Sequence, residues 1–543
     1  MSERPTLVLD YGAFPQPPSP LFRDYLAGVA RLAPFFAGGR WDIGAIGEAG
    51  ARTAGHRRER RQVAEILAAQ QRGRGAEEAE AAANRLTDDR SVAVVTGQQA
   101  VLFGGPLYVL YKALAAMRVA RDLERQQGVP AVPVFWVASD DHDFAEIRST
   151  TVLDEAGRLH TFRLNPQREP IGQPAWRILL DDGVAGLVEE TATRLPASPF
   201  REALVARLRD CYAPGESLSG AFARFLSALL PGLVVLDPAD PELKRLAAGV
   251  LRREIEEGSP TSRLAAETGR ALLGSGYHQQ VPVRDGFLNL FLLADGERRA
   301  LGFRGDSVEV RGTGRRLATA ALARRLDEEP QAFSPGVLLR PLVQDHLLPT
   351  ATYIGGPGEI AYHAQIGPSY AHFGIPRPVL LPRPSLTLIE PSQRRALESE
   401  NLTLAELEDD PEAVLARWTR EAYPEVEAAF ERTRESLGRE MAAVEEILAG
   451  LDPTLRAAAD AARGRALHQI DSLHEKATRA LKKRDQARAD RLRRTRDALF
   501  PGGSFQERGL GLIGPLARHG MALVDEIRER MDPWARGHQV LYL

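Results

Sequence analysis

Residues 91–108 read Ser-Val-Ala-Val-Val-Thr-Gly-Gln-Gln-Ala-Val-Leu-Phe-Gly-Gly-Pro-Leu-Tyr, and this stretch decides the fold. Its first five residues are apolar and β-branched, as is typical of a strand buried on both faces. A glycine-containing loop follows, and then a helical pattern over 107–127. A further apolar run at 132–137 predicts a second buried strand. Strand, loop, helix and strand make a βαβ unit, which predicts a parallel sheet.

The same succession of buried strand, glycine-containing loop and helix returns later in the chain. Residues 351–354 and 377–381 predict two more buried strands, separated by a glycine-rich loop and a helix. Between the two strand-rich regions, 281–293 and 300–311 are typical of antiparallel strands with glycine turns. Beyond Pro391, long helical patterns dominate, and a turn at Asp452-Pro453 predicts an antiparallel helical hairpin. We therefore expect an α/β fold with these parts: 1–150, a Rossmann-like core; 151–335, an inserted α+β connecting domain; 336–390, a second part of the core; 391–500, an antiparallel coiled-coil hairpin; 501–543, a segment that folds back on the core.

The composition indicates a globular protein and argues against several other classes of protein. The 543 residues are 44% apolar and 26% charged, as in an ordinary globular protein. The net charge of only −3 argues against nucleic acid as a partner. No apolar stretch approaches the ~20 residues that a membrane span needs, and we expect no membrane association. The single cysteine, Cys211, excludes an internal disulfide and a Cys-rich zinc site. With no basic and apolar leader after Met1, we expect a cytoplasmic protein.

The loop after the first strand is a candidate binding site. Gln98 and Gln99 can both donate and accept hydrogen bonds, and Gly104 and Gly105 allow a ligand to approach the backbone closely. In open α/β sheets ligands lie at the carboxyl ends of the strands, and a helix start offers free N–H groups. These residues are therefore expected to cradle a substrate or a phosphate. A purely structural turn between strand and helix is the alternative.

The loop after the second strand carries Asp140, Asp141, His142 and Asp143. A histidine flanked by carboxylates suits general acid-base catalysis. The same set also suits a hard cation such as Mg²⁺. Asp is favoured at helix N-caps, so a solvated turn that caps a helix is a third interpretation. We favour acid-base chemistry and predict no metal site.

A third candidate site combines Arg340 with Tyr353, Gly355, Gly356 and Glu359. Glycines before a helix form an anion-binding geometry. Glu359 in the first helical turn could complement the helix dipole, or it could hold an ammonium group or a sugar hydroxyl. A turn followed by a cap explains the spacing equally well. The basic run at 482–496 reads chiefly as a solvated helix face, and a nucleotide phosphate site is its alternative.

Taken together, these motifs resemble the cysteine-adding enzymes of bacillithiol biosynthesis. The resemblance covers nearly the whole chain and rests on long motifs. They are Thr96–Tyr108, Tyr111-Lys112, Val134–Ala138 leading into Asp141-His142-Asp143, Phe333-Ser334-Pro335, Arg340-Pro341-Leu342, Leu348-Pro349-Thr350, Tyr353–Glu359 and Phe505-Gln506-Glu507-Arg508. The chain departs from the family at Asp140, where Glu is common, and at His363, where an aromatic residue is common.

The resemblance implies a core of the nucleotidyl-transferase type and a coiled coil that supports a homodimer. It also implies a ligase that forms an amide bond between cysteine and glucosaminyl-malate, in the last step of bacillithiol biosynthesis. ATP is the activating cofactor that such families use, with Thr96 and Gly97 as its candidate contacts. Lys112 or Arg340 would hold the malyl carboxylate. The 141–143 triplet would orient the attacking amine and move its proton.

Two other functions stay open at this point. One is a metal-dependent hydrolase that uses the acidic cluster at 140–143. The other is a non-catalytic scaffold that acts through the helical hairpin.

Overall fold

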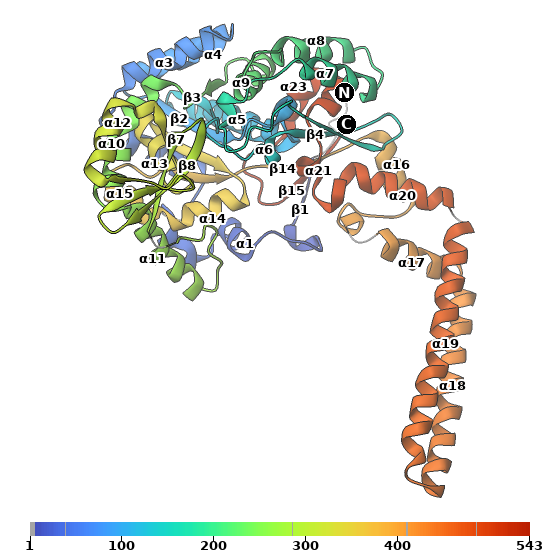
Figure 1. Ribbon diagram of the computed structural model, residues 1–543. Coiled ribbons are helices and arrows are strands. Elements are labelled where there is room, and N and C mark those ends of the chain that lie inside the picture. Colours follow the sequence, from blue (N-terminus) through green and yellow to red (C-terminus); the bar gives the residue numbers. More distant parts are fainter. Residues whose placement is uncertain (1–5, 38–39, 285, 409–410, 485) are drawn as a thin grey trace. The chain divides into compact units, whose positions relative to one another are not determined.

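The computed structural model describes residues 6–37, 40–284, 286–408, 411–484 and 486–543. It divides into two compact units (Figure 1). Unit 1 comprises Met1–Gly12, Pro17–Leu388 and Phe505–Leu543, and unit 2 comprises Ala13–Gln16 and Ile389–Ser504. Each unit is described by itself.

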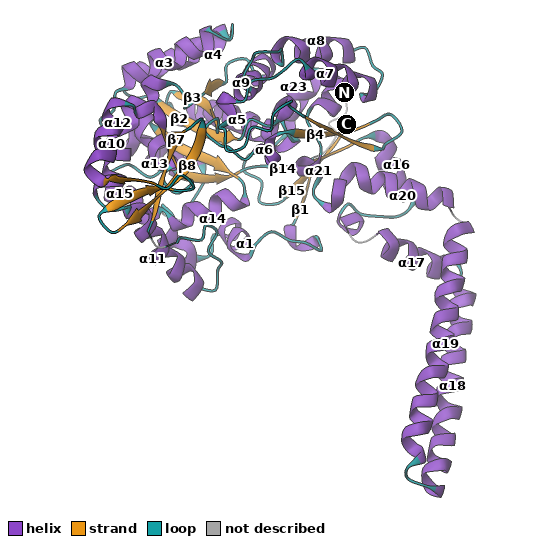
Figure 2. Ribbon diagram, viewed as in Figure 1, coloured by secondary structure: helices purple, strands orange, loops and turns teal. Residues whose placement is uncertain are grey.

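A parallel sheet lies at the centre of unit 1, and Figure 2 shows its strands among helices. Within the described residues its order is β13-β12-β2-β3-β6, and every neighbouring pair is parallel. The strands are β13 (Val379–Pro382), β12 (Thr350–Gly355), β2 (Val92–Gln98), β3 (Ala131–Val137) and β6 (Val234–Leu236). Strands β12, β13 and β6 are buried along their whole length, as expected for a sheet covered on both faces. The predicted α/β fold with a Rossmann-like parallel core is confirmed.

Strand β2, helix α5 (Leu107–Gln127) and strand β3 form the predicted βαβ unit. Strand β2 extends beyond the predicted end of the run, because Thr96, Gly97 and Gln98 continue the ladder against β3. The chain turns at Gly104 and Gly105, which have positive φ angles of 84° and 76°. Only glycine adopts such angles without strain, so these two residues set the entry into α5.

The order of the strands places a crevice between β2 and β12. From β2 the chain crosses to β3 on one side, and it later returns to β12 on the other side of β2. In open parallel sheets the ligand binds outside the carboxyl ends of the strands at such a switch point. The carboxyl ends of β2, β3 and β12 are Gln98, Val137 and Gly355.

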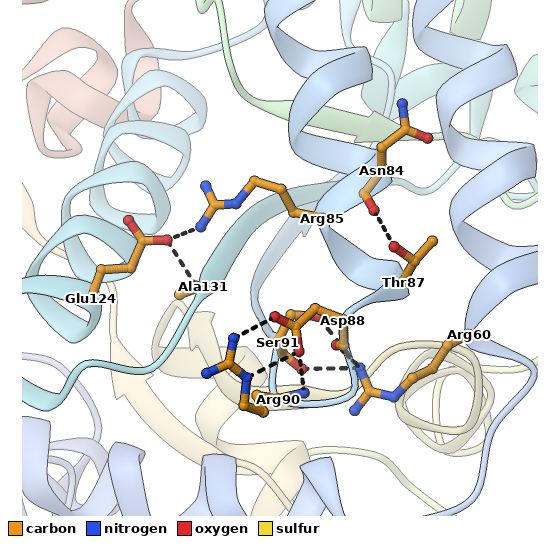
Figure 3. Close-up of polar contacts among 9 residues, drawn as sticks. All are labelled: Arg60, Asn84, Arg85, Thr87, Asp88, Arg90, Ser91, Glu124 and Ala131. Atoms are coloured by element: carbon orange, nitrogen blue, oxygen red, sulfur yellow. Dashed lines mark hydrogen bonds and ion pairs between the residues drawn. The ribbon is translucent and has the colours of Figure 1, made fainter.

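The opposite edge of the sheet is fixed by polar contacts (Figure 3). The buried Arg60 donates to the carbonyl oxygen of Ser91 at 3.0 Å, just before β2. Glu124 near the end of α5 accepts from the backbone N–H of Ala131 at 3.0 Å and from Arg85. These bonds satisfy backbone groups at the start of β2 and β3.

Three further sheets complete unit 1. An antiparallel sheet has the order β10-β9-β8-β7-β11, a hairpin joins β4 to β5, and a third sheet has the order β1-β15-β14. The antiparallel character predicted for 281–311 is confirmed, and the two predicted runs resolve into the shorter strands β7, β8 and β9. Strand β6, which lies inside the predicted insertion, joins the central sheet instead. The strands are β1 (Leu7–Leu9), β4 (Ser149–Leu153), β5 (Leu159–Arg163), β7 (Phe287–Ala294), β8 (Glu297–Arg304), β9 (Ser307–Val310), β10 (Arg315–Ala318), β11 (Phe333–Pro335), β14 (Ser385–Ile389) and β15 (His538–Tyr542).

Helices cover these sheets. Their bounds in unit 1 are α1 (Pro20–Ala27), α2 (Ile43–Ala54), α3 (Arg60–Arg72), α4 (Glu77–Asn84), α6 (Phe144–Ile147), α7 (Gly183–Arg194), α8 (Arg201–Cys211), α9 (Leu218–Leu229), α10 (Pro241–Glu256), α11 (Pro260–Gly274), α12 (Thr319–Glu328), α13 (Arg340–Leu347), α14 (Pro357–Gln365), α15 (Gly367–Phe373), α21 (Gln506–Gly509), α22 (Ile513–His519) and α23 (Ala522–Arg530). Among the described helices, none combines the length and apolar character that crossing a membrane requires.

Unit 2 contains the coiled-coil hairpin. Its helices are α16 (Pro391–Ser399), α17 (Pro411–Ala422), α18 (Pro424–Leu451), α19 (Leu455–Arg484) and α20 (Gln486–Leu499). Helices α18 and α19 lie side by side (Figure 1). They are antiparallel, because His474 contacts Glu427 while Arg463, earlier in α19, contacts Glu445, later in α18. The helix predicted over 454–499 is described as α19 and α20, and Asp485 between them lies outside the described residues.

Candidate active site

Two cavities open at the carboxyl edge of the central sheet. The first is a polar cavity of about 360 Å³ at the switch point between β2 and β12. It is lined by Gly97, Gln98, Gln99, Tyr108, Trp136, Ala138, Val337, Arg340, Tyr353, Gly356, Pro357, Gly358, Glu359, Tyr362, Arg383 and Arg508. The second, the apolar cavity, has about 350 Å³ and lies toward β3 and β6. Trp136, Ala138, Val337 and Arg340 line both cavities, so the two spaces adjoin.

A buried ion pair stands beside the polar cavity. The ammonium group of Lys112 lies 2.7 Å from Oε2 of Glu359. It also donates to the carbonyl oxygen of Gly97 at 2.6 Å and to Oε1 of Gln98 at 3.3 Å. Three acceptors around one nitrogen match the three protons of a charged lysine. Lys112 therefore ties the end of β2 to α14.

Glu359 is ionised in this arrangement. Burial opposes the charge, but Lys112, the Tyr353 hydroxyl and the backbone of Gly356 outweigh burial and hold the pKa of Glu359 below its ordinary value. The Tyr353 hydroxyl donates to Oε1 at 2.5 Å and the Gly356 N–H to Oε2 at 2.7 Å. Glu359 is thus both the N-terminal cap of α14 and the partner of Lys112. The cap predicted from the sequence is present, whereas binding of a ligand's ammonium group or sugar hydroxyl by Glu359 stays a prediction.

Among the described residues, the hydrogen-bond partners of Arg340 are neutral side chains. Its guanidinium donates to Gln344 at 3.0 Å and to the hydroxyl of Tyr362 at 3.1 Å. It also lies over the rings of Trp136 and Tyr353, at 6.0 and 5.6 Å from the ring centroids. These contacts fix its position, and Glu359 acts on its charge only from beyond ion-pair distance. An arginine without a directly bonded carboxylate in the shared wall of two cavities is suited to bind a carboxylate or a phosphate.

The apolar cavity carries the acidic cluster at one side. Asp140 pairs with Lys244 at 2.8 Å and accepts from Trp176 at 3.2 Å. Asp141 accepts from the side chain of Gln99 at 2.7 Å, which links the loop after β2 to the loop after β3. Both Asp140 and Asp141 line this cavity. The rest of the lining is mainly aromatic and aliphatic, with Phe287, Phe291, Phe333, Leu243, Leu251 and Val343 among its members.

His142 does not line this cavity, but it contacts Arg298 and Phe291, which do. Its Nδ1 atom is 3.1 Å from a guanidinium nitrogen of Arg298 and 3.8 Å from Asp141. Because arginine only donates, Nδ1 is the acceptor and the proton of the neutral ring sits on Nε2. Burial and Arg298 hold the pKa of His142 below its ordinary value, against the pull of Asp141 and Asp143. The imidazole is therefore neutral near neutral pH.

Three of the predicted site residues have a structural role. Asp143 is the N-cap of α6, where its carboxylate accepts from the N–H of Glu146 at 3.3 Å. Gly104 and Gly105 are buried and line neither cavity. A Cβ atom at Gly104 would lie 2.9 Å from Leu512 and from Phe225. These three residues therefore have a packing or capping role that explains their types without a ligand.

Comparison with known proteins shows which family the chain belongs to. Residues 9–384 match the family model described as bacillithiol biosynthesis BshC, N-terminal Rossmann-like domain. Residues 386–543 match the one described as bacillithiol biosynthesis BshC, C-terminal coiled-coil domain. The chain belongs to the BshC family. The resemblance seen in the sequence motifs is thus confirmed.

Relatives in the BshC family agree along most of their length. A protein of Salinibacter ruber is 35% identical over 537 residues, which cover 98% of this chain and 96% of the relative. One of Koribacter versatilis is 37% identical over 438 residues, with 80% and 81% covered. One of Anoxybacillus flavithermus is 30% identical over 489 residues, with 88% and 90% covered. All three carry the name "Putative cysteine ligase BshC".

Most, but not all, of the remaining predicted site residues of this BshC-family chain line the polar cavity. Gln98, Gln99, Arg340, Tyr353, Gly356 and Glu359 line the polar cavity, together with Gly97. Lys112 reaches it only through its partners, and Gly355 lies buried behind Glu359. The hydroxyl of Thr96 donates to the carbonyl oxygen of Ile354 inside the sheet. The side chain of Thr96 is therefore used between strands, and Gly97 packs closely on the backbone of Trp136.

The cluster at 140–143 does not converge on one point. Asp140 turns to Lys244, Asp141 to Gln99, and His142 to Arg298. Across the part of the chain that the structure describes, no three His, Cys, Asp or Glu side chains are grouped so that they could hold a metal ion. The family assignment favours the ligase over the hydrolase.

Several residues of the site were missed in the sequence. They are Lys244, Arg298, Arg383, Phe291 and Arg508. Lys244 had a signal, because it is one of only five lysines in an arginine-rich chain. Arg383 had another, since it directly follows a predicted core strand, in the same position as the other site residues. Arg298 and Phe291 come from the inserted antiparallel sheet, whose docking on the core no local pattern reveals.

Proposed function

We propose that this protein joins cysteine to glucosaminyl-malate through an amide bond, as the last step of bacillithiol biosynthesis. The observation that carries the proposal is the pair of adjoining cavities of similar volume, which share Trp136, Ala138, Val337 and Arg340. A ligation needs two substrates side by side, with the reacting atoms about 3–3.5 Å apart. Two cavities with one common wall provide that arrangement. The names of the relatives support the ligase chemistry.

In this proposal Arg340 binds a malyl carboxylate and Lys112 does not. Lys112 has all three of its protons committed to Gly97, Gln98 and Glu359. Arg340 forms no ion pair with a carboxylate in the described part of the chain, and charge-assisted bonds to a carboxylate are strong and can be bidentate. Between the two cations that the sequence offers for this role, the geometry favours Arg340.

Asp141 and His142 handle the attacking amine. Asp140 and Asp141 both line the apolar cavity, but Asp140 is already paired with Lys244, so Asp141 is the carboxylate that orients an ammonium group there. His142 is neutral near neutral pH and can take up the proton that leaves the amine before attack. Its acceptor atom Nδ1 is covered by Arg298, so proton uptake at Nδ1 requires the Arg298 contact to open.

An acyl group must be activated before an amine displaces its oxygen, and we propose that ATP supplies this activation. The cations that fit phosphate oxygens are Arg340 and Arg508, both in the wall of the polar cavity. Thr96 fits less well than the sequence suggested, because its hydroxyl is bonded to Ile354. Gly97 contributes only backbone to the cavity.

The reaction can be tested directly. Purified protein is incubated with cysteine and glucosaminyl-malate, with and without Mg-ATP, and products are followed by mass spectrometry. We expect a product with the mass of both substrates minus water, formed only with the nucleotide. The Arg340→Ala variant should lose most turnover, whereas Arg324→Ala, at an exposed arginine of α12 that lines neither cavity, should not.

A strain that lacks the gene for this protein provides a second test of the proposed reaction. It should accumulate the cysteine-free precursor, and the wild-type gene but not the Arg340→Ala variant should restore the thiol. A strain whose precursor level is unchanged, together with no ligation product under any condition, would exclude the proposed reaction.

We also propose that the protein acts in the cytoplasm as a homodimer assembled through the hairpin. Near its closed end the hairpin exposes Ile447 and Leu451, at 66% and 75% of their surface. Such side chains favour association with a second copy. Light scattering on the full chain and on the Ile447→Glu variant tests this, and a wild-type mass equal to one chain would contradict it.

A further inference from the structure

The segment that follows the hairpin contributes to the polar cavity. Glu507 and Arg383 form an ion pair at 2.7 Å, with side chains only 1% and 7% exposed. Glu507 also accepts from the backbone N–H of Leu386 and from the hydroxyl of Ser385, both at 2.9 Å. Arg383 itself lines the polar cavity. The backbone at 507 is therefore fixed beside the cavity by charge and by hydrogen bonds.

The next residue, Arg508, places its side chain in the wall of the same cavity. It is exposed, and among the described residues no carboxylate pairs with it. The charges lining the cavity can be paired off. Glu359 is matched by Lys112, and Arg383 is matched by Glu507. Arg340 and Arg508 remain, so the cavity carries an excess of positive charge that suits an anion.

Strand β14 holds this segment in place and is itself bonded to the C-terminal strand. The imidazole of His538 in β15 bonds to the hydroxyls of Ser385 and Thr387, both at 2.8 Å. The side-chain amide of Gln506 donates to the carbonyl oxygen of Leu388 at 2.9 Å, and its oxygen accepts the N–H of Leu388 at 2.8 Å. Such anchoring keeps a binding side chain in one place before the ligand arrives, which reduces the entropy lost on binding.

We propose that Arg508 is a substrate-binding residue that grips an oxyanion of the substrate together with Arg340, and that Glu507 is the positioning residue that fixes Arg383 and the backbone of Arg508. The ligand chemistry is a carboxylate or phosphate group. Its identification as the malyl group of glucosaminyl-malate or the phosphates of ATP rests on the proposed function. The consequence for the family is that the stretch matched as a coiled-coil domain supplies part of the site in the Rossmann-like unit.

Calorimetry without turnover tests the role of Arg508. The full chain is titrated separately with glucosaminyl-malate, with methyl glucosaminide, which lacks the carboxylates, and with ATP. The Arg508→Ala variant should bind one of the two anionic ligands at least tenfold more weakly, and Arg508→Lys should recover part of that loss. Methyl glucosaminide should bind both proteins equally. Arg324→Ala is the matched control for loss of an exposed arginine.

The ligand whose affinity falls in the Arg508→Ala variant shows which anion Arg508 binds. A loss confined to glucosaminyl-malate assigns the malyl carboxylates, and a loss confined to ATP assigns the phosphates. The proposal is overturned if both affinities stay within twofold, or if the wild-type protein binds neither anion. Because binding is measured alone, a missing ligation product would count against the proposed reaction and not against this site.

The role of Glu507 needs a separate readout. Glu507→Gln should raise the KM for the anionic substrate by about tenfold while kcat stays within twofold, because the chemistry is untouched. A variant with only a folding defect would lower the active fraction and kcat and leave KM unchanged. If Glu507→Gln does not fold, Ser385→Ala removes a single donor and should raise KM in the same direction. An unchanged KM in the folded variant refutes the positioning role.

Discussion

The Lys112→Met substitution probes the buried ion pair beside the polar cavity. Methionine keeps most of the length of the side chain but removes the charge that compensates Glu359. Removing one partner of a buried pair costs about 3–5 kcal/mol. We expect the lower end, about 3 kcal/mol, because 24% of the Glu359 side chain is exposed and two donors remain, Tyr353 and the Gly356 N–H.

The cost should depend on pH in a defined direction. In the wild type the pKa of Glu359 lies below its ordinary value, because Lys112 and the other donors outweigh burial. The pair therefore contributes stability above the ordinary carboxyl pKa, and that contribution is lost only as the pH falls through the lowered value. Without Lys112, burial dominates and raises the pKa of Glu359. In the variant, Glu359 is then protonated as the pH falls, which removes its unpaired buried charge. The difference in stability between wild type and variant should therefore be larger at pH 7.5 than at pH 5.5.

Urea unfolding followed by tryptophan fluorescence measures this difference. In a Trp418→Phe background, the remaining tryptophans at 41, 136, 176 and 534 all lie in unit 1, so the signal reports that unit alone. The double variant Lys112→Met/Glu359→Gln removes both charges and should recover more than 1 kcal/mol of the loss (about one third of the estimate above). The reasoning is refuted if the single substitution costs less than about 1 kcal/mol, or if the double variant is no more stable than the single one.

Four other outcomes are expected. His142→Ala should reduce turnover by about 10²-fold or more, and turnover within a few-fold of wild type would remove His142 from the chemistry. Because burial and Arg298 lower the pKa of His142, activity should fall only as the pH drops below the ordinary histidine range, and Arg298→Ala should shift that limb of the pH–rate profile to higher pH. Gly97→Ala should destabilise unit 1 by about 1–3 kcal/mol in urea unfolding, since its Cβ would lie 2.6 Å from the carbonyl oxygen of Trp136, and a wild-type midpoint would contradict this packing. Deleting residues 400–490 should abolish the dimer in light scattering while the isolated protein retains turnover, whereas a scaffold would lose only partner capture.

The central sheet could be predicted because its signal is local. Continuous apolar runs such as 91–95 and 132–137 identify buried parallel strands, and the glycine-containing loops after them mark the carboxyl edge. Strand β6 is only three residues long, and its place in the sheet depends on pairing with β3, which no local pattern encodes. The sequence therefore assigned it to the insertion.

The candidate site could be predicted in part for the same reason. Gln98 ends β2, Gln99 follows it, and Asp141 lies in the loop after β3, so the common sheet edge brings them together as expected. Gly104 has the same sequence signal as a ligand loop, but what decides its role is contact with Phe225 and Leu512, which are remote in the chain. Arg508 was missed because its place depends on the Glu507–Arg383 pair, another contact between distant parts of the sequence.

The two-way amide bond between Gln506 and Leu388 has a consequence for protein engineering. It fastens Leu388, where the chain leaves unit 1, to Gln506, just after the chain returns to unit 1. New chain ends opened at the Asp452-Pro453 bend would leave this bond intact, and a fluorescent or affinity module inserted at the bend would not interrupt the sequence of unit 1.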